Sequence, residues 1–215
     1  MQAQPQEPTS SLDTSNAPPA SAMTEQELET LVATFTSRGD IAKILTPGGI
    51  GAELGVAEGR FSARILESSK LSYLYSIDAW GDRGHDVNEY RIAFGNLHPY
   101  RARNTLLRMR FDEALPLFAD AFFDFIYIDG YAHTGEDGGQ TFRDWYPKLK
   151  PGGIMAGDDY HPTWPLVVEE VDKFSAANNL RLYVLNCVPE DDWASRYPTW
   201  FVCRPRSEAR RDEHL

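Results

Sequence analysis

From Ile50 onward, short apolar runs alternate with longer stretches whose apolar residues recur every three or four positions. Short apolar runs are typical of buried strands, and the three-to-four-residue recurrence is typical of amphipathic helices. Strands that alternate with helices form a mainly parallel sheet with helices on both faces. The predicted strands are residues 51–56, 73–78, 106–110, 123–129, 153–157, 180–188 and 199–203, and the predicted helices fall around 59–69, 86–103, 137–148 and 164–178.

The last two predicted strands have no helix between them. A polar loop at residues 189–198 separates them, which favours a hairpin that adds an antiparallel edge to the sheet. The predicted fold class is therefore α/β, with a doubly wound, Rossmann-like, mainly parallel sheet of seven strands and an antiparallel C-terminal hairpin.

The ends of the chain differ in composition from the part between them. Residues 1–22 are rich in Gln, Pro, Ser, Thr and Ala and offer almost nothing to bury, so we predict a disordered tail. Thr24 and Glu27 form a capping box for a first helix, whose apolar pattern ends near Gly39. The domain predicted to fold spans residues 23–207, and residues 208–215 form a C-terminal tail.

The net charge of −11 limits the classes of partner. Binding to nucleic acid or to an anionic membrane needs a basic surface, so we expect neither. No apolar run is long enough to span a membrane, and Arg38 is the first basic residue, which leaves no basic leader segment. We expect a cytoplasmic protein that acts on a small-molecule acceptor, with the first helix as a candidate contact for a second copy in a homo-oligomer.

The first predicted strand leads into a turn of small residues. Gly55, Ala57 and Gly59 permit a tight turn and a close approach of a ligand to the backbone, and a helix begins directly afterwards. The turn lacks the Gly-x-Gly-x-x-Gly spacing that places a pyrophosphate on a helix N-terminus. It follows Glu53, whose carboxylate would repel a pyrophosphate and attract a sulfonium or amino group. The turn is therefore predicted to bind a ligand that is cationic at this end.

Acidic residues end three further predicted strands. Asp78 ends the second, where a carboxylate can accept hydrogen bonds from two ribose hydroxyls. Asp129 ends the fourth strand, and Asp158 and Asp159 end the fifth. These last three carboxylates would repel one another, and a divalent cation such as Mg²⁺, Mn²⁺ or Ca²⁺ would relieve the repulsion. The alternative is that they only cap the turns that follow the strands.

These motifs resemble those of the class I S-adenosylmethionine-dependent methyltransferases. The resemblance runs from about residue 48 to 203 and includes Phe-Ile-Tyr-Ile-Asp-Gly at 125–130 and Leu-Lys-Pro-Gly-Gly at 149–153. It implies S-adenosylmethionine as the cofactor, with residues 55–59 at its methionine portion, 78–80 at the adenosine and 112–114 at the adenine. For Trp80, a lid position and a core position remain equally open. The residues that the resemblance assigns to the cofactor are Glu53, Gly55, Val56, Ala57, Gly59, Asp78, Ala79, Trp80, Asp112, Glu113 and Asp129.

The acidic strand ends are similar to those of the metal-dependent small-molecule O-methyltransferases, which include catechol-type enzymes and relatives that act on sugars and natural products. This resemblance implies Asp129, Asp158 and Asp159 as ligands of Mg²⁺, with Asp159 standing where the catechol-type enzymes have Asn. The implied reaction is methyl transfer to a hydroxyl of a sugar, phenol or natural product. Asp129 and His133 are the predicted catalytic residues, and His161 is the rival base.

Three alternatives remain open for the function. They are a metal-independent methyltransferase that acts on another acceptor atom, a non-catalytic S-adenosylmethionine-binding protein, and an oxidoreductase with a nicotinamide cofactor. The missing dinucleotide motif and the presence of Glu53 count against the oxidoreductase. The acceptor pocket is expected from residues 81–103 and from the loop at 189–198, whose aromatic side chains suit an apolar or sugar substrate.

Overall fold

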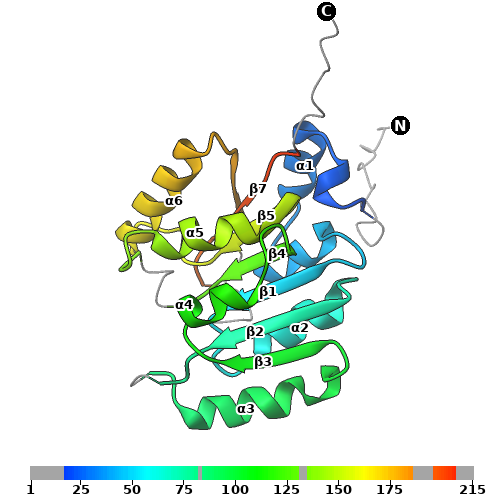
Figure 1. Cartoon of the computed structure of the whole chain (residues 1–215). Helices are drawn as coiled ribbons and strands as arrows, with labels where there is room; N and C mark the ends of the chain where they lie inside the picture. The colour runs from blue at the N-terminus through cyan, green and yellow to red at the C-terminus, as the bar shows by residue number, and fades with distance from the viewer. Residues whose placement is uncertain (1–16, 82–83, 131–134, 186–195, 207–215) are drawn as a thin grey trace, which may run out of the picture.

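A seven-stranded sheet forms the centre of the computed structural model, which describes residues 17–81, 84–130, 135–185 and 196–206 (Figure 1). The strands are β1 (Ile50–Leu54), β2 (Tyr73–Asp78), β3 (Asn104–Arg108), β4 (Phe123–Ile128), β5 (Leu149–Gly157), β6 (Leu182–Leu185) and β7 (Thr199–Cys203). Their order in the sheet is β3-β2-β1-β4-β5-β7-β6. Neighbouring strands are parallel, except that β7 pairs antiparallel with both β5 and β6. The predicted α/β sheet with its antiparallel C-terminal edge is confirmed.

The α-helices are α1 (Glu25–Val32), α2 (Arg60–Ser68), α3 (Val87–Leu97), α4 (Phe111–Ala114), α5 (Gln140–Trp145) and α6 (Pro165–Ala177). The four longer helices after β1 fall within the predicted stretches, and α4 is an addition between β3 and β4. The Thr24–Glu27 capping box begins α1 as predicted, but α1 ends at Val32 and a 3₁₀ helix, η3 (Arg38–Ile44), follows it. Within the described ranges, no helix is both long enough and apolar enough to cross a membrane.

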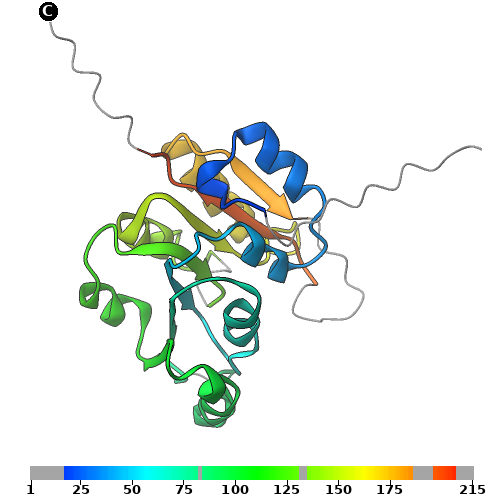
Figure 2. The same cartoon turned by 90° about the vertical axis from the view of Figure 1, so that its right-hand side faces the viewer.

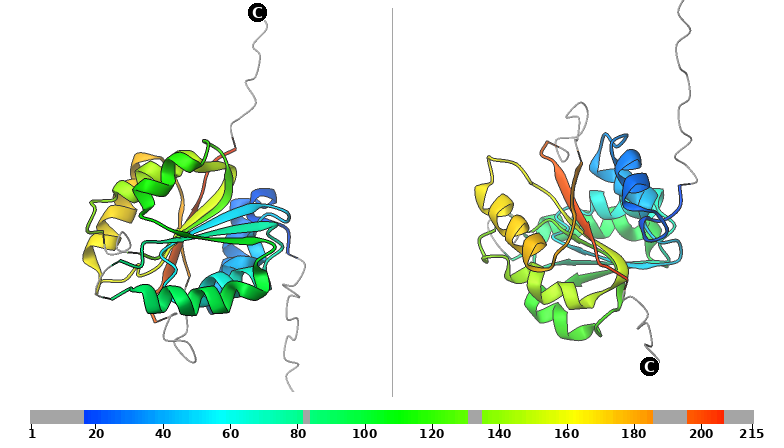
Figure 3. Two further views of the ribbon diagram at one scale, coloured as in Figure 1. Left: turned by 60° about the horizontal axis from the view of Figure 1, so that its bottom comes forward. Right: turned by 90° about the horizontal axis from the view of Figure 1, so that it is seen from above.

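Helices cover both faces of the sheet, as Figure 3 shows from two directions. Strand β4 explains why, because successive side chains of a strand point to opposite faces. Phe125 and Tyr127 pack with residues of α1, η3 and α2, whereas Ile126 and Ile128 pack with residues of α4, α5 and α6. The uninterrupted apolar run from Phe125 to Ile128 can be buried completely only if both faces of the strand are covered.

The N-terminal segment lies beside β6 and β7 (Figure 2). Helix α1 contacts β6, where Leu28 and Val32 are buried. The short 3₁₀ helix η2 (Ala20–Ala22) contacts β5, and the side chain of Ala20 is buried. Packed structure therefore begins inside the segment predicted to be a tail, because a small apolar side chain in that segment does find a place to be buried.

Two strands begin two or more residues before their predicted positions. Strand β3 starts at Asn104, because the buried amide of Asn104 donates hydrogen bonds to the carbonyl oxygen of Leu74 and to Ser76 Oγ, at 3.0 and 2.9 Å. Strand β5 starts at Leu149, because the Lys-Pro-Gly-Gly run that looked like a turn forms an irregularity within the sheet. Phe123 pairs with Leu149 there, and Phe125 already pairs with Ile154.

The ends of β1 and β4 are in direct backbone contact. Gly55 has a φ of +95°, and a Cβ placed on it would lie 2.0 Å from the carbonyl oxygen of Asp129. The N–H of Asp129 donates to the carbonyl of Leu54 at 2.7 Å. Only glycine combines this backbone conformation with this approach. Since the strand order reverses between β1 and β4, the contact lies where doubly wound sheets bind ligands.

Gly55→Ala is expected to lower the free energy of unfolding by about 2 kcal/mol or more, because the added Cβ forces the ends of β1 and β4 apart. Gly95→Ala is the matched control. Gly95 lies in α3 with open space around a Cβ, so alanine there is expected to stabilise the protein by about 0.5–1 kcal/mol. Urea unfolding followed by circular dichroism measures both variants. A Gly55 variant as stable as the wild type would contradict the contact.

Candidate functional site

The turn between β1 and α2 is held by the carboxylate of Asp78 at the end of β2. The N–H groups of Val56 and Ala57 donate to one carboxylate oxygen, at 2.9 and 3.0 Å. The N–H of Trp80 donates to the other oxygen, at 2.9 Å. Ala57 has a φ of +46°, so these bonds stabilise a turn that its own backbone disfavours. The structure thus brings the predicted glycine turn and Asp78 together, and it gives Asp78 a structural role as well.

Trp80 is a buried support of the same turn. Its side chain is 1% exposed, and its indole N–H donates to the carbonyl of Ala57 at 2.8 Å. The ring packs edge-on against Tyr90, with 4.9 Å between the ring centroids. Of the two positions left open for Trp80, the core position is therefore the one observed. The exposed neighbour Ala79 remains available to a ligand.

Glu53 lies beneath the turn, with 2% of its surface exposed. Its carboxyl group accepts a hydrogen bond from Ser62 Oγ, which is in turn hydrogen-bonded to Ser76 Oγ at 2.8 Å. Burial raises the pKa of Glu53 to about 8, and the opposing hydrogen bond from Ser62 does not cancel this effect. A carboxyl group that is protonated at neutral pH carries no charge to attract a sulfonium. The direct electrostatic role predicted for Glu53 is therefore not supported by this arrangement.

The raised pKa of Glu53 links stability to pH. Between pH 4.5, the ordinary pKa, and about pH 8, the folded protein keeps a proton that the unfolded chain releases. This group therefore lowers the free energy of unfolding as the pH rises, by up to about 1.4 kcal/mol per pH unit. Glu53→Gln removes the effect, so the stability of this variant is expected to fall less than that of the wild type between about pH 5 and about pH 8. Urea unfolding across that range measures both, and parallel profiles would show that Glu53 is ionised in the fold.

An arginine from the N-terminal segment bridges Asp129 and Asp158. Nη1 of Arg38, the first residue of η3, donates to Asp129 Oδ2 at 2.7 Å and to Asp158 Oδ2 at 3.1 Å. The guanidinium lies over the ring of Phe61, 4.4 Å from its centroid. Asp158 also accepts a hydrogen bond from Thr199 Oγ1 at 3.0 Å. Both carboxylates therefore have a fixed cationic partner.

The electrostatics of this bridge follow from its burial. Burial alone would lower the pKa of Arg38, but Tyr127, Asp129 and Asp158 around it raise that pKa well above its ordinary value. Burial and the neighbouring Asp129 carboxylate raise the pKa of Asp158, against the opposing effect of Arg38. Removal of either partner of a buried ion pair leaves an uncompensated charge, which is strongly destabilising.

The bridge does not fit the predicted magnesium site. Among the described residues, no group of three or more His, Cys, Asp or Glu side chains is placed to bind one metal ion. Asp159 is buried and has a left-handed backbone, with a φ of +62°. The two carboxylates that should share a divalent cation share Arg38 instead. The predicted crowding of carboxylates is present, and a guanidinium supplies the charge that relieves it.

The two acidic residues predicted to contact adenine have local partners. Asp112 forms an exposed ion pair with Arg110 at 2.9 Å, and Glu113 accepts a hydrogen bond from the N–H of Arg110 at 2.9 Å. Both side chains are exposed on α4. The residue of α4 that approaches the strand ends is Phe111, whose ring lies 2.5 Å from the position of a Cβ on Gly130.

Of the two candidate bases, His133 and His161, the structure describes only His161. His133 lies outside the described residues, as does most of the loop at 189–198. His161 is exposed, its Nδ1 lies 3.0 Å from Thr163 Oγ1, and its ring leans on that of Tyr197 with 5.2 Å between the centroids. These contacts place His161 in a surface loop.

Arg38 and Thr199 were not predicted to belong to the site. Neither belongs to a motif, and Arg38 lies 91 positions from Asp129 in the sequence. The available signal is the pair Ser37 and Asp40, which forms a capping box in the structure and places Arg38 at the first position of η3. That signal indicates a helical turn, but it does not indicate that the turn folds over the strand ends.

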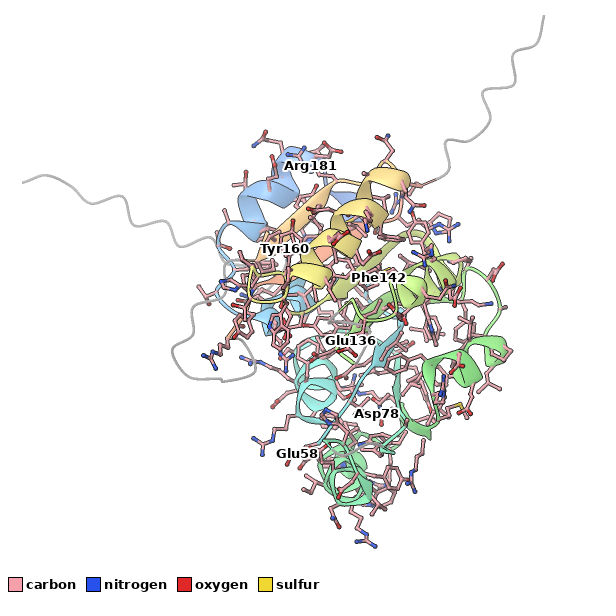
Figure 4. The ribbon with its side chains drawn as sticks, turned by 90° about the vertical axis from the view of Figure 1, so that its left-hand side faces the viewer. Glu58, Asp78, Glu136, Phe142, Tyr160 and Arg181 are labelled. Carbon is pink, nitrogen blue, oxygen red and sulfur yellow. The ribbon has the colours of Figure 1, made fainter. Side chains whose placement is uncertain are left out.

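The parallel strands all end at one edge of the sheet, and Figure 4 looks onto that edge. Asp78 and Glu58 lie on the side of β2 and α2, and Tyr160 lies on the side of β5 (Figure 4). Strand β4 ends between them, with the side chain of Asp129 25% exposed and that of Asp158 7% exposed. Asp129 is thus the bridged carboxylate that reaches solvent.

A doubly wound sheet with a glycine turn after its first strand and a carboxylate at the end of its second defines a nucleoside-binding α/β protein. A family model described as a methyltransferase domain matches residues 52–160, just over half of the chain. The chain therefore belongs to this family of S-adenosylmethionine-dependent methyltransferases. No curated protein matches it.

Solved structures share the fold at low sequence identity. An S-adenosylmethionine-dependent O-methyltransferase from Thermotoga maritima has a TM-score of 0.58 and 16% identity, over 86% of this chain and 68% of that chain. Precorrin-6y C5,15-methyltransferase from Geobacter metallireducens has a TM-score of 0.55 and 14% identity, over 91% of this chain and 96% of that chain. Phosphoethanolamine N-methyltransferase 2 from Haemonchus contortus, in complex with S-adenosyl-L-methionine, has a TM-score of 0.54 and 13% identity, over 78% of this chain and 51% of that chain. These likenesses show the fold alone.

Proposed function

We propose that this protein transfers the methyl group of S-adenosylmethionine to a hydroxyl of a small molecule, such as a sugar, a phenol or a natural product. The observation that carries the proposal is the methyltransferase-domain match, because residues 52–160 contain the turn, Asp78 and Asp129. The net charge of −11 supports a small acceptor over a nucleic acid. The name of the Thermotoga maritima neighbour, an O-methyltransferase, supports oxygen as the accepting atom.

The residues at the strand ends suit the cofactor. A carboxylate has about four lone-pair sites, and backbone N–H groups occupy three of those on Asp78, so one remains for a ribose hydroxyl. Beside the turn, the backbones of Gly55 and Gly130 pack directly against each other, which fixes the end of β4 next to the turn. Bound S-adenosylmethionine supplies an electrophilic methyl group, and its sulfur keeps the electron pair of the broken C–S bond.

Asp129 is the residue that we propose to handle the proton of the acceptor. Its carboxylate is the more exposed of the two that Arg38 bridges. When the acceptor oxygen bonds to the methyl carbon, its hydroxyl proton passes to Asp129 and then to water, which balances the reaction. His133 keeps its predicted place as a second base. Magnesium has no step in this proposal, because Arg38 holds the oxygens that would bind it.

Binding of the cofactor is the direct test. Isothermal titration calorimetry is expected to show micromolar binding of S-adenosylhomocysteine to the wild type and no binding of nicotinamide dinucleotides. Transfer of a radiolabelled methyl group to a panel of hydroxyl compounds then tests the reaction. Folded protein that takes up neither S-adenosylmethionine nor S-adenosylhomocysteine would refute the proposed function.

Asp78→Asn is expected to weaken S-adenosylhomocysteine binding by about tenfold or more, or about 1.4 kcal/mol. The reason is that an amide nitrogen in place of either carboxylate oxygen faces a backbone N–H, which disturbs the turn as well as the ribose contact. Asp120→Asn, at an exposed surface pair with Lys148, is the control and is expected to bind as the wild type does. The titration is run on variants with native circular dichroism. Unchanged affinity of a folded Asp78 variant would remove Asp78 from the site.

A further inference from the structure

We infer that Arg38 takes the place of a divalent cation at the ends of β4 and β5, so that this protein methylates its acceptor without a metal. Arg38 is a positioning residue in this proposal, because it acts by holding Asp129 where the acceptor binds. The inference deepens the proposed function and rests on it. It concerns a residue that lies outside the matched methyltransferase domain, which begins at residue 52.

Arg38 fills the space that a shared metal ion would need. A single nitrogen atom, Nη1 of Arg38, lies within hydrogen-bond distance of one oxygen of Asp129 and one oxygen of Asp158, at 2.7 and 3.1 Å. Divalent cations bind carboxylate oxygens at about 2.0–2.6 Å. An ion shared by these two oxygens would therefore occupy the volume that Nη1 fills. The guanidinium and the ion cannot both be present, and their like charges would also repel each other.

The packing around Arg38 holds its side chain in this position. Its side chain is 9% exposed and its guanidinium lies over Phe61, whose ring packs on that of Tyr127 with 4.4 Å between the centroids. The main chain on either side is fixed by the capping box of Ser37 and Asp40, in which the N–H of Ser37 donates to Asp40 Oδ2 at 3.0 Å. An exposed arginine could swing away to admit an ion, whereas Arg38 would have to leave packed surroundings.

The bridge also fixes the orientation of the Asp129 carboxylate. Asp158 is 7% exposed and is also fixed by Thr199, so it serves as the anchored end of the bridge. The second N–H of the same nitrogen then fixes Asp129, the end that reaches solvent. A metal at this place would orient the acceptor oxygen by binding it directly. Arg38 instead orients the carboxylate that receives the acceptor's proton.

Uptake of Mn²⁺ tests the inference without any cofactor or acceptor. The loss of the free-ion signal in electron paramagnetic resonance is recorded while wild type, Arg38→Met and Arg38→Lys are titrated with MnCl₂. Arg38→Met is expected to bind Mn²⁺ at least tenfold more tightly than wild type or Arg38→Lys. At Mn²⁺ concentrations that lower the free-ion signal with Arg38→Met, the other two proteins are expected to leave that signal unchanged. Removing the cation frees two adjacent carboxylates, whereas lysine keeps the charge.

Arg181→Met is the matched control. Arg181 also pairs with two carboxylates, Glu25 and Glu29, but on an exposed surface away from the strand ends. Its loss is expected to produce no Mn²⁺ uptake and no change in methyl transfer. For Arg38→Met, kcat is expected to fall at least tenfold with little change in the KM for S-adenosylmethionine, and added Mn²⁺ is expected to restore part of kcat. Wild-type methyl transfer is expected to withstand EDTA.

Three results would overturn the inference. They are stoichiometric Mn²⁺ binding by the wild type, loss of wild-type activity in EDTA, and a folded Arg38→Met that takes up no Mn²⁺. If Arg38→Met does not fold, Arg38→Gln replaces it, because glutamine keeps a hydrogen-bonding end over Phe61 and is judged by the same outcomes. Titration with S-adenosylhomocysteine runs in parallel. Failure of that titration refutes the proposed function, whereas the Mn²⁺ results bear on Arg38 alone.

Discussion

The site depends on the contact between the backbones at the ends of β1 and β4. Gly55 lies against the carbonyl of Asp129, and no side chain separates the two chains there. This contact sets where the turn to α2 begins, and Asp78 then holds that turn by its N–H groups. It also sets the position of Asp129, from which the bridge to Arg38 follows. A displacement of β1 against β4 would therefore disturb both the turn that Asp78 holds and the bridge between Arg38 and Asp129.

The sequence predicts the sheet well because both of its faces are buried. A strand covered on both sides is mostly apolar, and β4 shows this in an uninterrupted run from Phe125 to Ile128. The strand ends are harder to predict, because they depend on partners from elsewhere in the chain. Asn104 looks like a loop residue until Leu74 and Ser76 satisfy its amide, and Leu149 looks like the start of a turn until β4 pairs with it.

The same division holds for the site. The turn and Asp78 are predictable because each occupies a set place at the end of its own strand, and the topology then brings the two together. The crowding of Asp129 and Asp158 is predictable from the sheet, but the group that neutralises them is not. A metal and an arginine satisfy the same electrostatic requirement, and Arg38 comes from a segment whose path no motif indicates. The protonation of Glu53 was not predicted, because the burial that raises its pKa depends on packing that the sequence does not display.

The carboxyl groups at the strand ends are neutralised in three different ways, and the difference assigns their roles. Asp78 accepts backbone N–H groups, Glu53 retains a proton, and Asp158 shares a buried guanidinium with Asp129. Burial of a charge is costly unless it is compensated, so the first three of these groups are committed to the fold. Asp129 alone of the four combines a fixed partner with a side chain that is a quarter exposed. This combination of a fixed partner and access to solvent is why we propose Asp129, and not one of the other three, as the acceptor of the proton.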